Sequence, residues 1–194
     1  MDQKKLWDNI APEWTKFKTR PIEHTKEFLK KQTGNVLDLG SGAGRHLQKI
    51  KNGKMYLVDF SKEMIKHAKE KNIDAKFFIS DITKLPFENN FFDAAICISS
   101  LHCIETKQKR KQATQELYRV LKPNAKAFIG VWNKNSKRFK NAEKEKYIDW
   151  KGMGKRYYYL YDEKEIHDLF KKIGFKIIST HNSEMMINFI VEKN

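Results

Sequence analysis

The chain has 194 residues, of which 40% are hydrophobic and 32% charged, and a formal net charge of +15 at pH 7. This length allows one domain with a sizeable core, and this composition excludes a disordered chain. No stretch reaches the roughly 18 unbroken apolar residues of a membrane-spanning helix, so no membrane contact of that kind is expected.

The positive charge and the cysteines limit the partners and the compartment. A charge of this sign attracts polyanions, so contact with a nucleic acid is expected, although a lysine-rich composition alone would produce the same value. Cys97 and Cys103 lie six residues apart, which fits neither a disulfide framework nor a zinc pattern. No secretory signal is recognisable. We therefore expect a cytoplasmic protein without a bound metal.

Residues 1–33 predict a helical cap. Apolar side chains recur there at helical spacing, at Leu6, Trp7, Ile10, Trp14 and Phe17. Pro12 divides this stretch and is expected in the first turn of a second short helix. A further helix is predicted from Pro21 to Thr33, because proline opens it and Gly34 closes it.

Short apolar runs that alternate with helices follow the cap. The predicted strands are Asn35–Leu39, Met55–Asp59, Lys76–Ser80, Phe92–Ile98 and Ala125–Val131. The helices between them are predicted at Arg45–Lys51, Ser61–Lys71 and Lys107–Leu121. Buried strands that alternate with helices are typical of right-handed βαβ units, so we predict a parallel sheet covered on both faces.

Region 133–160 is interpreted as a basic and aromatic insertion outside the core. Its part from Asn133 to Arg156 carries nine Lys or Arg against three acids. Such a surface binds phosphates, and Lys107, Lys109, Arg110 and Lys111 can join it, but a solvated loop would have the same composition.

The end of the chain predicts a helix and an edge hairpin. The helix spans Asp162–Ile173, with Asp162 as its N-cap and Glu165 completing a capping box. Strands at 175–180 and 187–191 follow it and close the sheet. Residues 1–194 are therefore predicted to form a single domain.

A glycine-rich turn after the first strand is the clearest candidate site. The strand runs into it within V-L-D-L-G-S-G-A-G, residues 36–44. Glycine lets a ligand lie against the main chain, so we assign a ligand to Gly40, Ser41, Gly42 and Gly44. Arg45 follows Gly44, so the G-x-G-x-x-G of dinucleotide-binding proteins is not met. Asp38 precedes the turn, where it would meet a cation and repel a pyrophosphate.

Two more acids end successive predicted strands. Asp59, nineteen residues after the first glycine of the turn, can accept both hydroxyls of a ribose, and Asp81 can accept from an adenine amino group. Their neighbours Phe60 and Ile82, and Ser99 after the fourth strand, are assigned to the same site. Singly, each feature also fits an ordinary turn or helix cap. Together, at successive strand ends, they predict a nucleoside-containing ligand.

On these residues the chain resembles the class I S-adenosylmethionine-dependent methyltransferases over nearly its whole length. The resemblance implies an α/β fold with a doubly wound, Rossmann-like sheet of seven strands, the last of them antiparallel. It also implies S-adenosylmethionine as cofactor, with the ammonium of its methionine part at Asp38.

Four other segments resemble a narrower family, the tRNA wobble-uridine carboxymethyl methyltransferases. They are residues 7–21 (W-D-N-I-A-P-E-W-T-K-F-K-T-R-P), 99–110 (S-S-L-H-C-I-E-T-K-Q-K-R), 116–132, and 155–161 (K-R-Y-Y-Y-L-Y). The sequence departs from the family at Cys103 and Tyr159, where the family has histidine. The resemblance implies esterification of a 5-carboxymethyluridine in the tRNA anticodon region, and a small zinc-binding activator subunit as a partner.

This reaction assigns roles to further residues. A carboxylic acid with a pKa of about 4 is ionised at neutral pH, so its attack on a methyl group requires no strong base. Arg20 is the candidate that holds the carboxylate, and His102 the candidate that orients it or the uridine. The residues assigned to the uridine are Trp132, Arg156, Tyr157, Tyr158 and Tyr161. The alternatives are a surface ion pair for Arg20, a satisfied buried histidine for His102, and packing for the tyrosines.

Three other functions compete with this interpretation. A small-molecule methyltransferase would keep the cofactor site and make the basic surface incidental. A non-catalytic RNA-binding protein would carry a degenerate site, against which the intact acids and glycines argue. A nicotinamide oxidoreductase is the weakest alternative, because of the glycine spacing.

Overall fold

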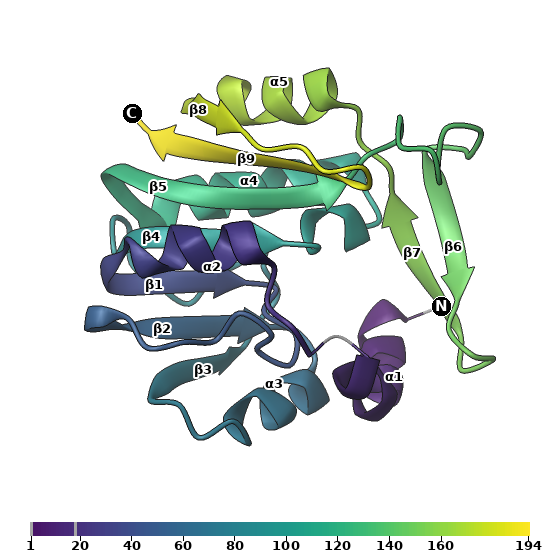
Figure 1. Cartoon of the computed structure of the whole chain (residues 1–194), viewed down its shortest axis with the longest axis horizontal. Helices are drawn as coiled ribbons and strands as arrows, with labels where there is room; N and C mark the ends of the chain where they lie inside the picture. The colour runs from purple at the N-terminus through teal and green to yellow at the C-terminus, as the bar shows by residue number, and fades with distance from the viewer. Residues whose placement is uncertain (1, 18) are drawn as a thin grey trace.

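A seven-stranded mixed sheet forms the centre of the molecule in a computed structural model that describes residues 2–17 and 19–194 (Figure 1). Its order is β3-β2-β1-β4-β5-β9-β8. The strands are β1 (Thr33–Leu39), β2 (Lys51–Asp59), β3 (Ala75–Ile79), β4 (Phe92–Ile98), β5 (Leu121–Trp132), β8 (Phe175–Thr180) and β9 (Met186–Lys193). Strand β9 is antiparallel to both neighbours, whereas β3 to β5 pair in parallel. The predicted sheet, its antiparallel last strand and its edge hairpin are thus confirmed.

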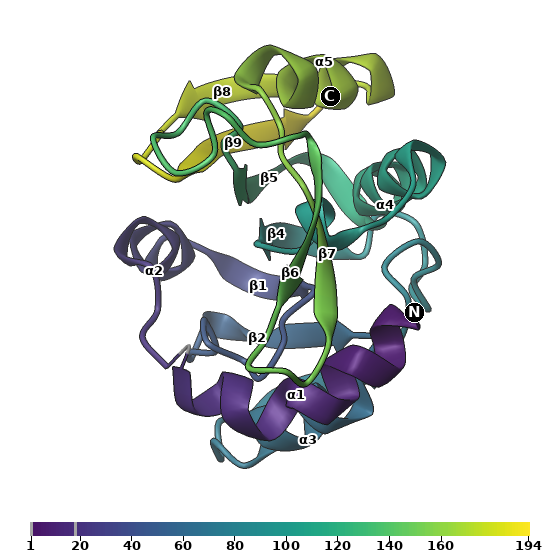
Figure 2. The ribbon, with the colours of Figure 1, turned by 90° about the vertical axis from the view of Figure 1, so that its right-hand side faces the viewer.

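Two layers of helices cover the sheet because its central strands are apolar on both faces. Helices α2 (Glu23–Lys30) and α3 (Lys62–Lys69) pack on one face, and α4 (Lys107–Val120) and α5 (Glu163–Ile173) pack on the other (Figure 2). Adjacent residues of one strand serve opposite layers: Val36 packs with α2 and α3, and Leu37 packs with α4 and α5. None of the helices in the described ranges is long and apolar enough to cross a membrane.

Two helix predictions were wrong, and the backbone explains both. Residues 42–46 form turns and β2 already begins at Lys51, so no helix spans Arg45–Lys51; Gly42 and Gly44 have positive φ there. At the N-terminus one helix, α1 (Gln3–Phe17), runs through Pro12 without a break. A proline inside a helix removes one hydrogen bond, and burial of Leu6, Ile10 and Ala11 before it opposes that loss.

A two-stranded ribbon and α1 lie beyond the carboxyl ends of the parallel strands (Figure 1). The ribbon consists of β6 (Glu145–Asp149) and β7 (Lys155–Tyr159). Gln3 connects α1 to β7, because its side chain donates to the Lys155 carbonyl at 3.3 Å and accepts from the Tyr157 amide at 3.0 Å. The region predicted to lie outside the core therefore contributes a buried strand, in which Tyr157, Tyr158 and Tyr159 are all buried.

Candidate active site

A cavity of about 660 Å³ opens where the strand ends meet α1 and β7. The predicted site residues that line it are Asp38, Gly40, Ser41, Gly42, Asp59, Phe60, Asp81, Ile82, Ser99, His102, Trp132 and Tyr158. Strands β1, β2 and β5, the segments that follow β1, β2, β3 and β4, and the ribbon bring these residues together, although they span 121 positions of the sequence. The remaining predicted residues are absent from the described lining; they are Arg20, Gly44, Arg156, Tyr157 and Tyr161.

The glycine-rich turn is held against β2 and β4. The Ser100 hydroxyl donates to the Gly40 carbonyl at 2.9 Å, and the Gly42 amide donates to the Asp59 carboxylate at 2.8 Å. Gly40 has φ of +72°, and a Cβ added there would lie 2.2 Å from the Ser100 hydroxyl oxygen. Only glycine, which has no Cβ, tolerates both this positive φ and this close approach of Ser100. Gly44 differs, since a Cβ there would meet Leu57 and Ala68 in the core, and Gly44 is absent from the described cavity lining.

Asp38 is the main feature of the cavity floor. Its side chain is buried, and its Oδ2 atom has no hydrogen-bond partner among the described residues. Burial raises the pKa of this carboxyl to about 7; Arg45 and Lys71 oppose the shift, and Asp59 adds to it. A buried carboxylate without a partner is costly, and a cationic ligand would relieve that cost. This orphaned oxygen fits the predicted cationic group.

Asp59 and Asp81 continue the polar side of the cavity. Asp59 accepts from the amides of Gly42 and Ser61 at 2.8 and 2.9 Å, and burial raises its pKa to about 6. Asp81 is exposed, and its Oδ1 accepts from the amide and hydroxyl of Thr83, both at 2.8 Å. A carboxylate oxygen accepts more than one hydrogen bond, so both acids retain capacity for ligand hydroxyl or amino groups.

His102 is a neutral donor in this cavity. Its Nδ1 atom accepts from the Trp132 amide at 2.9 Å, and burial lowers the pKa of the imidazole to about 3. A main-chain amide can only donate, so Nδ1 carries no proton. The proton of the neutral ring is therefore on Nε2. Cys103, next to it, is an inert thiol: burial raises its pKa to about 12, and it donates to the Ser99 carbonyl.

An aromatic stack forms the opposite wall. The Trp132 ring lies between Tyr158 and Phe139, with centroid distances of 4.1 and 4.9 Å. The Tyr158 hydroxyl accepts a 2.5 Å hydrogen bond from Arg156, which is itself buried but not among the described lining residues. Trp132 and Tyr158 line the cavity, so this stack gives it one aromatic wall.

Three more predicted residues, besides Gly44 and Arg156, lie away from the cavity lining. Tyr157 accepts from buried Arg110 at 3.2 Å, and Tyr161 packs in the core between the sheet and α5. Both side chains serve packing in this structure. Arg20 is exposed in the loop between α1 and α2, apart from the cavity that His102 lines. The structure therefore does not bring the two predicted catalytic residues together.

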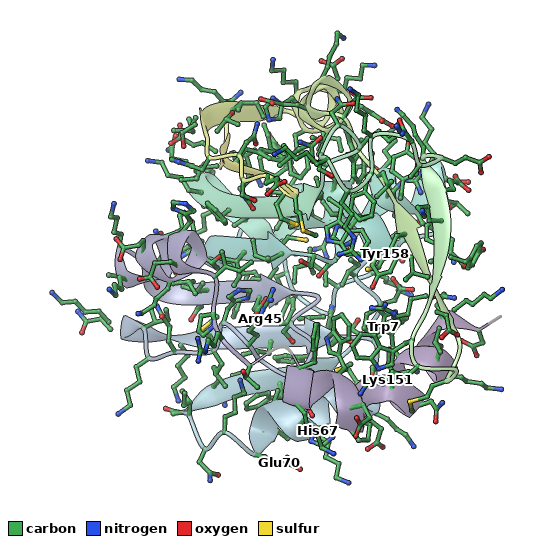
Figure 3. The ribbon with its side chains drawn as sticks, turned by 45° about the vertical axis from the view of Figure 1, so that its right-hand side comes forward. Trp7, Arg45, His67, Glu70, Lys151 and Tyr158 are labelled. Carbon is green, nitrogen blue, oxygen red and sulfur yellow. The ribbon has the colours of Figure 1, made fainter. Side chains whose placement is uncertain are left out.

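Residues of α1 were missed as part of the site. Trp7 and Trp14 line the cavity (Figure 3 labels Trp7), although their helical spacing resembles that of a core-facing stripe. Asp8 anchors the helix: it accepts from the Ser61 hydroxyl at 2.7 Å and from the Glu63 amide at 3.3 Å, at the start of α3. An acid inside an aromatic helical stripe was the signal that could have revealed this contact.

Comparison with known proteins identifies the domain. Residues 37–129 match the family model described as a methyltransferase domain. Over 142 residues the chain is 33% identical to the tRNA (carboxymethyluridine(34)-5-O)-methyltransferase alkbh8 of Xenopus tropicalis. That alignment covers 72% of this chain but 22% of the length of the relative.

Solved structures share the fold. A SAM-dependent methyltransferase from Methanosarcina mazei superposes with a TM-score of 0.72 at 20% identity, covering 89% of this chain and 97% of that one. A chain from the complex that contains the Haloferax volcanii Trm112 methyltransferase activator gives a TM-score of 0.74 at 15% identity, covering 98% and 96% of the two chains. The sheet is thus that of the class I methyltransferases.

Proposed function

This chain carries a methyltransferase domain of the S-adenosylmethionine-dependent class, and we propose that it forms the methyl ester of 5-carboxymethyluridine at the wobble position of tRNA. The observation that carries the proposal is one cavity with a cation-seeking carboxylate at one end and a donor-lined aromatic wall at the other. The name of the Xenopus tropicalis relative supports the choice of acceptor.

The residues present fit the cofactor. Asp38 is suited to its ammonium, Asp59 to its ribose hydroxyls and Asp81 to its adenine, and Gly40 lines the same cavity. When bound, S-adenosylmethionine supplies a methyl group attached to a positively charged sulfur.

The protein's task is then to position the acceptor. The uridine base packs against the aromatic wall that Trp132 and Tyr158 give the cavity. The Nε2–H of His102 donates to the carboxylate and orients it. Since the acceptor is already ionised, no group removes a proton, and the catalytic effect comes from orientation and from the exclusion of water by α1.

Basic residues around the ribbon are proposed to bind the tRNA. The exposed ones are Lys137, Arg138, Lys140, Lys144, Lys151 and Lys155, with Lys107, Lys109 and Lys111 on the neighbouring α4. Contacts with phosphates give affinity and register without reading the sequence. Arg110 differs from its neighbours, because it is buried against Tyr157.

A small activator subunit is the second proposed partner. The neighbour from the complex with the Haloferax volcanii activator supports it. On this chain the edge strand β3 is open to pairing and exposes Ile79, whose side chain is unusually accessible for an isoleucine.

The test uses methyl-labelled S-adenosylmethionine and bulk tRNA, with and without a candidate activator. Label that enters tRNA and is released by mild alkali as methanol supports the ester. Label that resists alkali contradicts the ester and indicates methylation of a base or ribose. Cofactor binding without any transfer to tRNA would instead favour a small-molecule acceptor.

A further inference from the structure

Arg156 is a buried cation at the back of the aromatic wall. Its guanidinium carbon lies 4.7 Å from the ring centroid of Trp150, 4.9 Å from Trp14, 5.1 Å from Tyr158 and 5.9 Å from Trp7. These rings come from α1, the ribbon and its turn, so the cage exists only in the folded chain. Figure 3 labels Trp7 and Tyr158, which come from α1 and β7.

The charge of Arg156 is not cancelled by an acid. No ion pair of Arg156 occurs among the described residues, and its Nε atom is buried without a partner. Aromatic faces stabilise a guanidinium through their quadrupoles but contribute no negative charge. Buried charges in proteins are ordinarily paired, so this one leaves a positive potential on the adjacent cavity wall.

Tyr158 transmits this charge to the cavity. Its hydroxyl oxygen accepts from Arg156 Nη1 at 2.5 Å, and its ring lines the cavity beside His102, with centroids 5.6 Å apart. Burial raises the pKa of the phenol, so it keeps its proton. Because the Tyr158 oxygen already accepts from Arg156, the Tyr158 hydroxyl donates its own proton to a different partner. The cation behind the hydroxyl makes it a stronger hydrogen-bond donor.

We propose that Tyr158 is the donor that selects a carboxylate on the methyl acceptor, and that Arg156 is the positioning residue that orients and polarises it. The inference rests on the proposed function, and it adds the specificity of the acceptor end: an anion is accepted and a neutral isostere is disfavoured. His102 Nε2–H is the second donor of the same recess. Arg20, which is outside the cavity, has no part in it.

Competition binding tests the proposal. Two anticodon stem–loop RNAs, one with 5-carboxymethyluridine and one with its neutral amide 5-carbamoylmethyluridine, compete for the protein loaded with S-adenosylhomocysteine. The wild type is expected to prefer the acid by about tenfold or more. Tyr158→Phe and Arg156→Met are each expected to reduce that preference by about tenfold, and Arg156→Lys to restore part of it.

Controls separate this role from a structural one. Tyr147→Phe, on the exposed face of β6, is the matched tyrosine variant and is expected to keep the wild-type preference. Affinity for S-adenosylhomocysteine monitors folding; if Arg156→Met does not fold, Tyr158→Phe decides. A wild type that prefers the acid together with a Tyr158→Phe variant that keeps this preference would overturn the inference while the proposed function stands. A wild type that neither prefers nor methylates the acid overturns the proposed function itself.

Discussion

Opposite charges lie at the two ends of the cavity, because acids line one end and a cation lies behind the wall of the other. At the β1–β2 end, buried Asp38 and Asp59 have raised pKa values, and a bound cation would stabilise their ionised forms. At the end formed by β7 and the loop after β4, buried Arg156 lacks an acidic partner and His102 is neutral. Each end is unfavourable by itself and would be relieved by a ligand of opposite charge. This difference is what a cavity would need to hold a cationic methyl donor together with the anionic acceptor that we propose.

The largest effect is expected from removing the negative charge of Asp38 at the β1–β2 end of the cavity. Asp38→Asn keeps the shape of the side chain but removes its charge, so the affinity for S-adenosylmethionine should fall by about 100-fold. Calorimetric titration measures it. Asp81→Asn is the matched control, because Asp81 is exposed and its change should cost only a few-fold. An Asp38→Asn variant within threefold of wild type would show that this end is not charge-selective.

The next effect concerns the contact between Gly40 and Ser100, which follow β1 and β4. Gly40→Ala places a Cβ 2.2 Å from the Ser100 hydroxyl at φ of +72°, and should lower the free energy of unfolding by about 3 kcal/mol. Gly152→Ala has nearly the same φ, +74°, with nothing within 4 Å, and should cost about 1 kcal/mol. Urea denaturation compares them. Equal losses would mean that backbone strain alone, and not this contact, matters.

A pH titration should separate the two ends. The pKa of Asp38 is raised to about 7 in the free protein, and a bound cation favours its ionised form. The affinity for S-adenosylmethionine should therefore be close to its maximum at pH 8 and fall about tenfold by pH 6, because Asp38 must then lose a proton when the cofactor binds. The pKa of His102 is about 3, so binding of the acceptor RNA should stay nearly flat over this range. An RNA affinity that falls in parallel would contradict the separation.

The smallest effect is expected outside the cavity. Lys137→Ala removes an exposed cation near the positive end and should weaken tRNA binding about threefold, reducing the slope of log affinity against log salt by about one. Lys51→Ala is the control and should change neither quantity, because Lys51 begins β2 and so lies at the opposite end of the parallel strands from the cavity. Filter binding at several salt concentrations measures both. If both variants lost tRNA affinity equally, the RNA-binding surface would extend over the whole molecule.

Local signals in the sequence determined the sheet and the negative end of the cavity. Strands buried on both faces are continuous apolar runs, so Phe92–Ile98 was predicted with the observed bounds. The edge strand Phe175–Thr180 was also predicted with the observed bounds, although it is not buried on both faces. Asp38, Gly40 and Asp59 each follow or end such a strand, and parallel strands bring their carboxyl ends to one edge. Gly44 looked equivalent to Gly40 because a positive φ is a local property, whereas its packing against Leu57 is not.

Only the tertiary structure decided the positive end. Arg20 and Arg156 were both assigned to the methyl acceptor from the sequence, but the chain leaves the first on the surface and encloses the second among rings of α1 and the ribbon. Likewise, Trp7 and Tyr158 lie 151 positions apart, and nothing in the spacing of either indicates that both line one cavity. Strands can be predicted from local sequence patterns. Whether a buried charge is paired depends on distant segments, which come together only when the chain packs.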